Sequence, residues 1–102
     1  MVVLSVLYPA KPDARFDYDY YMAIHIPLVR EVFGAGLTSV EVQQPLSSGD
    51  GSAAPYVCMA HLRFESPEAM QASTSHPRAP EVMADIANFT DITPMTVVSA
   101  VR

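Results

Sequence analysis

The chain of 102 residues carries a formal net charge of −5, and half of its residues are hydrophobic. This length suits a single domain over 1–102 and excludes a dinucleotide-binding domain joined to a second domain. The acidic balance and the scattered Lys and Arg residues argue against a nucleic-acid or anionic-membrane partner and favour a small hydrophobic ligand. Cys58 is the only cysteine, so no intrachain disulfide or thiolate metal site is expected, and a reducing cytoplasm is the expected location.

The first half of the chain predicts two strands and one long helix. Residues 2–8 are β-branched and apolar, which indicates a strand, and the segment lacks a basic leader and is too short for a signal or membrane segment. Asp17 can cap a helix that runs to Phe33 and stops at a glycine. Leu37–Gln43 alternates apolar and polar residues, as is typical of a half-buried strand.

The second half predicts two further strands and two short helices. Residues 45–55 form a loop rich in Ser, Gly and Pro, which is either a mobile connector or a flap over a site. Residues 56–65 and 95–101 indicate strands, while Ser66 begins a helix that ends near His76 and a shorter helix follows over 80–87. This order predicts an α+β, ferredoxin-like βαββαβ fold, in which a four-stranded antiparallel sheet carries its helices on one face.

The expected sheet leaves one face bare. The first and last strands carry apolar residues on both faces, and two helical segments can cover only one of them. We therefore expect a homodimer whose two sheets pack face to face, with Met59 on the bare face and His61 and Arg63 near its rim.

His25 lies in the middle of an otherwise apolar helix face. At about 100° per residue, one stripe of the helix contains Tyr18, Tyr21, Met22, His25, Leu28, Val29, Val32 and Phe33. Tyr20 lies toward the opposite side. Pro27 predicts a local bend beside His25, because proline removes one helical hydrogen bond. A histidine on such a face is either a core residue satisfied by a nearby carbonyl or hydroxyl group, or a functional residue.

The helix pattern Phe16-Asp17-x-Asp19-Tyr20-Tyr21-x-x-x-His25-x-Pro27-Leu28 resembles the opening motif of the EthD family. These are small dimeric α+β barrel proteins named from ethyl tert-butyl ether degradation. Segments 62–69 (LRFESPEA) and 83–91 (MADIANFTD) resemble later blocks of the same family, so the resemblance covers nearly the whole chain.

The resemblance implies a two-subunit barrel with one cleft per subunit, between the sheet and the helices. It also implies a role in catabolic or secondary-metabolic oxidation. The broader relatives include cofactor-free monooxygenases, muconolactone isomerases, polyketide cyclases and haem-binding enzymes, so the fold alone does not select a reaction. His25 occupies the position of the family's motif histidine, which favours a functional role for it.

Three residues are candidates for acid and base chemistry. A neutral His25 imidazole can take or give a proton near neutral pH, and Tyr21 lies one helical turn earlier, where its hydroxyl can orient the ring or bind a substrate oxygen. Asp85 can orient His25 if the third helix packs against the first. The alternatives are a half-buried Tyr21 with its hydroxyl in water, and Asp85 as an ordinary surface acid.

An apolar wall suited to a small cyclic ligand is expected from Tyr18, Met22, Leu28, Phe64 and Phe89, although core packing explains these residues equally well. Cys58 on a buried strand is expected to be inert. No metal site is expected, because His61 and His76 form no metal-binding spacing with His25. Dinucleotide, phosphate and serine-hydrolase motifs are absent, and no cofactor is expected.

Two functional hypotheses follow from these residues. The first is an enzyme that binds a small hydrophobic or cyclic metabolite and assists an oxidative or isomerising step, with His25 as the proton-transfer residue. The second is a non-enzymatic binding module that carries a pathway intermediate for a separate oxygenase. Haem binding, with the imidazole as axial ligand, is a third alternative.

Overall fold

A computed structural model describes residues 1–102. The chain forms, in order, β1 (Val2–Pro9), α1 (Tyr18–Tyr20), the π-helical turn η1 (Tyr21–His25), α2 (Ile26–Phe33), β2 (Leu37–Gln43), β3 (Tyr56–Phe64), α3 (Pro67–Thr74), α4 (Ala79–Asp85), the 3₁₀ turn η2 (Ile86–Asn88) and β4 (Met95–Ala100). None of these helices has the length and apolar character that crossing a membrane requires.

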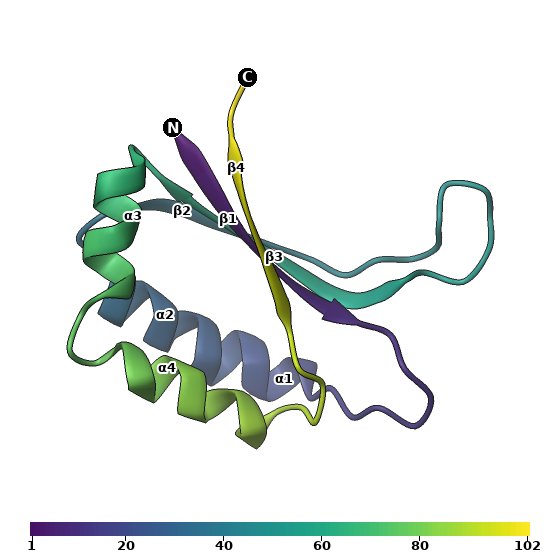
Figure 1. The fold of residues 1–102 in the computed structure, drawn as a ribbon. Coiled ribbons are helices and arrows are strands. Elements are labelled where there is room, and N and C mark those ends of the chain that lie inside the picture. Colours follow the sequence, from purple (N-terminus) through teal and green to yellow (C-terminus); the bar gives the residue numbers. More distant parts are fainter.

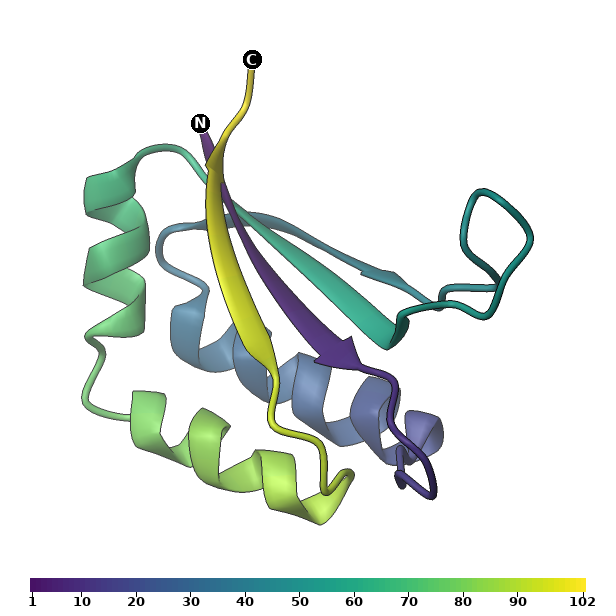
Figure 2. The same ribbon diagram turned by 45° about the vertical axis from the view of Figure 1, so that its right-hand side comes forward.

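The four strands form one antiparallel sheet in the order β2-β3-β1-β4. All the helices lie on the same face of this sheet, and β4 lies at its edge (Figure 1 and Figure 2). This arrangement confirms the predicted ferredoxin-like α+β fold.

The first helical segment begins where the sequence predicts. The Asp17 side chain accepts a hydrogen bond from the Tyr20 amide across 3.1 Å, as an N-cap does. The expected irregularity near Pro27 takes the form of a π-helical turn, in which the Ile26 amide donates to the Tyr21 carbonyl. Proline cannot donate to the preceding turn, so the chain accommodates one extra residue just before it.

The π-helical turn shifts the buried face of the helix by one residue. Ile26, which the α-helical stripe omits, is 5% exposed, whereas Met22, which the stripe includes, is 48% exposed. The prediction that Met22 faces the core is therefore wrong, because the stripe assumes an uninterrupted α helix. Tyr20, expected on the opposite side, is partly buried and reaches the last residue of α4.

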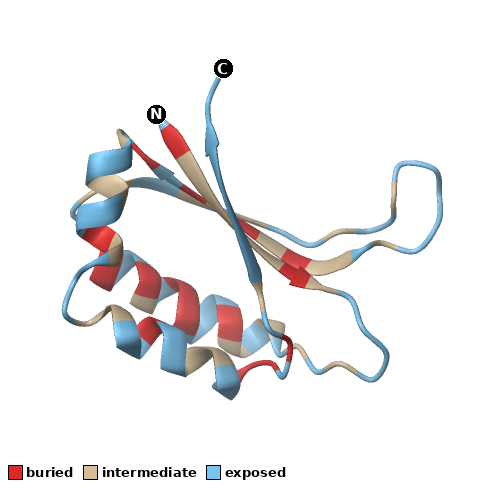
Figure 3. Ribbon diagram, viewed as in Figure 1, coloured by how far each residue is buried: buried red, intermediate tan, exposed pale blue.

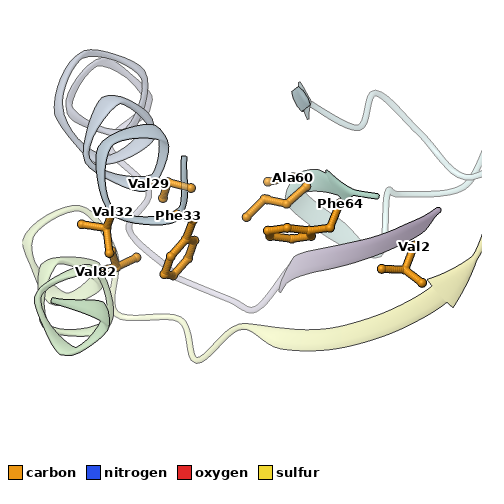
Figure 4. Close-up of a cluster of buried hydrophobic side chains, with 8 residues drawn as sticks. Val2, Val29, Val32, Phe33, Ala60, Phe64 and Val82 are labelled. Carbon is orange, nitrogen blue, oxygen red and sulfur yellow. The ribbon is translucent and has the colours of Figure 1, made fainter. Parts of the chain in front are cut away.

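The core lies between the sheet and the helices. One cluster of buried side chains joins α2 and α4 to β1 and β3, and Figure 4 shows Val29, Val32, Phe33 and Val82 on the helical side of it. A second cluster, which includes Tyr8, Tyr21, Cys58 and Phe89, fills the other end of the layer. By contrast, β4 is exposed along its whole length (Figure 3).

The loop over 45–55 projects beyond the end of the sheet, away from the helical layer (Figure 1 and Figure 2). The hydrogen bonds at its tip are local, since the Ser48 amide donates to the Ser52 carbonyl and the Ser48 hydroxyl to the Ala53 carbonyl, while Pro55 at its end accepts from the Ala10 amide. This placement favours the connector over the flap.

Candidate functional site

A histidine and a carboxylate meet where the helix formed by η1 and α2 packs against α4. His25 is the last residue of η1 and Asp85 is the last residue of α4, and Nδ1 of His25 lies 2.9 Å from Oδ2 of Asp85. Both side chains are largely out of solvent, with 5% and 10% of their surface exposed. Asp85 is therefore not an ordinary surface acid, which was the alternative that the sequence left open.

Two further residues donate hydrogen bonds to Asp85. The Tyr20 hydroxyl lies 2.5 Å from Oδ1, and the Asn88 side-chain amide lies 3.0 Å from the same oxygen. Burial raises the pKa of Asp85, but the hydrogen bonds from Tyr20, Asn88 and His25 outweigh it and hold the pKa below its usual value. The carboxylate is thus ionised at neutral pH, so Nδ1 of His25 must carry the proton that the pair shares.

The other ring nitrogen of His25 has no hydrogen-bond partner in the chain. The only fully buried side-chain nitrogen or oxygen without a partner is Oγ of Ser73, so Nε2 of His25 must keep accessible surface. Burial lowers the pKa of His25 more than the Asp85 carboxylate raises it, and the net pKa lies below the usual value. At neutral pH the ring is therefore uncharged, with a free lone pair on Nε2.

Aromatic rings hold the imidazole in place. The Tyr21 ring stacks on His25 with centroids 5.5 Å apart and planes 20° apart, and the Phe89 ring centroid lies 4.7 Å from that of His25. Tyr21 is 1% exposed rather than half-buried with its hydroxyl in water. Burial, with a further contribution from Cys58, raises the pKa of Tyr21, so that its hydroxyl stays protonated.

His25 and Tyr21 line a cavity of about 170 Å³ between the sheet and the helices. The cavity is bounded by β1, β3 and the start of β4 on one side and by η1, α2, α3 and α4 on the other, and 13 of its 17 lining residues are hydrophobic. Two of the lining residues, Met83 of α4 and Thr96 of β4, are exposed. The cavity therefore reaches the surface between α4 and β4.

The apolar wall expected from the sequence does not coincide with this lining. Tyr18, Met22, Leu28, Phe64 and Phe89 are all absent from it. Phe64 and Phe89 are fully buried in the core clusters, Met22 points outward, and the Tyr18 hydroxyl donates to the Val57 carbonyl. The substrate-binding role predicted for these five residues is not supported by the cavity, because they fill the core or lie outside it.

Sequence reasoning missed three residues of this region. Tyr8 lines the cavity from β1, and the alternation of that strand, which places it on the face of Val2, Leu4 and Val6, was a signal that could have found it. Tyr20 and Asn88 carried no such signal, because their bonds to Asp85 depend on how two helices distant in sequence pack together.

The remaining candidate residues lie elsewhere. Cys58 is fully buried, and burial raises the pKa of its thiol, which makes it a poor nucleophile. His61 lies on the other face of the sheet, where Nδ1 lies 2.9 Å from Oγ of Ser5 and Nε2 lies 3.1 Å from Oε1 of Gln43. No three His, Cys, Asp or Glu side chains gather as metal ligands would.

Comparison with known proteins relates the whole chain to one family. The EthD domain model matches residues 12–93. An EthD-like protein from Ralstonia eutropha is 32% identical, with 96% of this chain and 88% of that chain covered and a TM-score of 0.87. An EthD family protein from Bacillus halodurans is 20% identical, with 100% and 99% covered and a TM-score of 0.79.

A more distant structural neighbour shares the fold alone. SnoaB, a cofactor-independent oxygenase from Streptomyces nogalater, is 9% identical, with 99% of this chain and 92% of that chain covered and a TM-score of 0.68. No curated protein sequence matches the chain significantly.

Proposed function

This chain belongs to the EthD family, and on that basis we propose that it binds a small hydrophobic or cyclic metabolite and assists an oxidative or isomerising step. His25 is the proton-transfer residue of this proposal. The observation that carries it is the neutral imidazole, fixed by Asp85 through Nδ1, with an unpartnered Nε2 at an apolar cavity. The oxygenase activity of SnoaB, a neighbour in fold, agrees with the oxidative alternative.

The geometry supports a specific first step. Nε2 of His25 accepts a proton from an acidic O–H or C–H group of the ligand, and Asp85 stabilises the imidazolium that forms. Return of this proton to another carbon of the ligand completes an isomerisation. In the oxidative alternative, the ligand anion gives one electron to dioxygen, and the resulting carbon radical and superoxide combine to form a peroxide anion. The imidazolium returns its proton to this anion, and loss of water from the hydroperoxide leaves a carbonyl group on a carbon that carried a second hydrogen.

Tyr21 has a supporting role in this proposal. Its ring stacks on the imidazole, and its hydroxyl, kept protonated by burial, is a hydrogen-bond donor for an oxygen that becomes negative during the reaction. A porphyrin ring is far larger than a cavity of about 170 Å³, so the site as it stands does not fit haem.

The test compares the wild type with His25→Ala and His25→Gln. Each protein is supplied with small phenols and with enolisable cyclic ketones, while oxygen uptake and the exchange of deuterium at the acidic carbon are followed. We expect turnover to fall about a hundredfold to ten-thousandfold in both variants, because each removes the proton acceptor. A correctly folded His25→Ala protein with full activity would contradict the catalytic role of His25.

A binding module without catalysis is the second candidate. The predominantly hydrophobic lining of the cavity favours it, because such a lining can hold a ligand without any acid or base. In that case the ligand binds equally tightly to wild type and His25→Ala, and no turnover is detected in either.

A further inference from the structure

Three polar aromatic side chains line the cavity as neighbours. The ring centroids of Tyr8 and Tyr21 are 5.9 Å apart, and those of Tyr21 and His25 are 5.5 Å apart. All three residues belong to the lining. Tyr8 has no part in the proton transfer proposed above, so its hydroxyl needs another explanation.

Neither the Tyr8 nor the Tyr21 hydroxyl makes a hydrogen bond to a nitrogen or oxygen atom of the chain, and the Tyr21 hydroxyl has only the Cys58 thiol, a weak acceptor, beside it. Because Oγ of Ser73 is the only fully buried side-chain nitrogen or oxygen without a partner, both hydroxyls must retain some accessible surface. The two residues are each 1% exposed overall, so very little else of them is accessible. Both residues belong to the lining of the cavity, where a ligand would meet this accessible surface.

The tyrosine hydroxyls and the His25 imidazole offer opposite hydrogen-bonding roles to a ligand. Burial raises the pKa of Tyr8, as it does that of Tyr21, so both hydroxyls stay protonated and can donate. Nε2 of His25 carries no proton and can only accept. A ligand that satisfies both must donate one hydrogen bond and accept another, and a single hydroxyl group does both.

Size and charge restrict the rest of the ligand. An apolar protein cavity of roughly 150 Å³ is large enough to hold benzene, and the volume here is about 170 Å³. No Lys, Arg, Asp or Glu side chain lines the cavity. A carboxylate or a phosphate would enter it without a counter-charge, which is costly.

We infer that the cavity binds a single uncharged ring that carries a hydroxyl group, a phenol or a cyclic enol. Its O–H donates to Nε2 of His25, and its oxygen accepts from the hydroxyl of Tyr8, alone or together with that of Tyr21. This inference rests on the proposed function of the same site and adds the substrate class. It also makes Tyr8 a residue that determines specificity, because its hydroxyl recognises the oxygen of the ligand.

The test uses four small probes and needs no turnover. Phenol is compared with anisole, which keeps the oxygen but lacks the O–H, with toluene, which lacks both, and with benzoate, which adds a charge. Dissociation constants are measured from NMR shifts of the methyl groups of Leu4, Val6 and Ile26, which line the cavity. We expect phenol to bind about tenfold more tightly than anisole or toluene, and benzoate not to bind.

A pair of variants tests the role of Tyr8. Tyr8→Phe is expected to weaken phenol binding severalfold and to leave toluene binding unchanged, because it removes a hydroxyl and keeps the ring. Tyr56→Phe is the matched control, since Tyr56 is a tyrosine of β3 outside the lining. It is expected to change neither affinity.

Two outcomes would overturn the inference: toluene binding as tightly as phenol, or phenol binding unaffected by Tyr8→Phe. Neither result decides whether His25 is catalytic, because that is tested by the turnover of His25→Ala. Conversely, a fully active His25→Ala protein would remove the proposed catalysis, whereas a wild type that prefers phenol and loses this preference in Tyr8→Phe would keep the ligand class.

Discussion

Asp85 lies 2.9 Å from His25, although 60 residues separate them in the chain. The two residues come from different helices, and each occupies the end of its helical segment. Because Tyr20 and Asn88 also bind the carboxylate, Asp85 is held from three sides. The orientation of the imidazole therefore depends on the packing of the helices as well as on the helix that carries it.

Replacing Asp85 by Asn is expected to lower the pKa of His25 further, because the carboxylate is the group that opposes the effect of burial. We also expect at least about a tenfold loss of turnover, since the amide does not stabilise an imidazolium. NMR titration of the imidazole protons measures the pKa. Asp19→Asn, an exposed acid near the same helix start, is the control, and an unchanged or raised His25 pKa in Asp85→Asn would contradict the assignment.

Stability is expected to fall as the pH drops below neutrality. The pKa of His25 is lower in the folded protein than its ordinary value of 6.5, so between the two values the unfolded chain binds more protons and acidification favours unfolding. The lowered pKa of Asp85 adds a second loss of stability, as the pH falls below its ordinary value of 3.8.

Urea unfolding of the wild type and His25→Gln between pH 5 and pH 7.5 measures the first effect. The variant is expected to lose less stability per pH unit in this range than the wild type. His76→Gln, which removes an exposed histidine, provides the control. Equal slopes for the wild type and His25→Gln would show that His25 does not cause the dependence.

The sheet face opposite the helices is expected to form a homodimer, as the apolar residues on both faces of the first and last strands predict. Val97 and Val98 are adjacent in β4, point to opposite faces, and are 43% and 54% exposed. Val97→Asp is expected to shift a dimer toward monomers, because it places a charge in the interface, whereas Val98→Asp keeps the dimer. Size-exclusion chromatography with light scattering at micromolar concentration measures both, and a monomeric wild type would contradict the prediction.

Gly36 is expected to tolerate no side chain. A Cβ at this position would lie 2.7 Å from the Ala69 carbonyl oxygen and 2.7 Å from Oγ of Ser73. Gly36→Ala should destabilise the protein by about 1–3 kcal/mol, because β2 and α3 must move apart. Gly49→Ala, which meets nothing within 4 Å, should change stability far less, and a similar urea midpoint for both variants would contradict the steric explanation.

The elements themselves follow from local signals in the sequence. The bounds of β2 agree with its alternation, and Ser66 caps α3 as expected by accepting a hydrogen bond from the Ala69 amide. Such signals involve residues a few positions apart, so they act before the chain is folded.

The candidate site was less accessible to sequence reasoning. The position of His25 followed from helical spacing, but the exposure of Met22 depends on a π-helical turn that the spacing cannot indicate. The contact between Tyr20 and Asp85 depends on how α1 and α4 pack, and this packing is set by side chains from the whole core. The phenylalanines expected at the ligand, Phe64 and Phe89, belong to the core instead, and hydrophobicity alone does not distinguish the two.

The π-helical turn also ties the facing of this helix to the number of residues in it. It contains one residue more than an α helix would need to connect the same ends. Deletion of the exposed Ala23 would leave Tyr21 and Val29 seven positions apart, which is the spacing of two residues on one face of a regular α helix. The shortened helix could therefore keep both residues against the sheet, whereas a regular α helix of the present length would rotate one relative to the other by about 100°, so the extra residue is compatible with the cavity wall only while the turn stays π-helical.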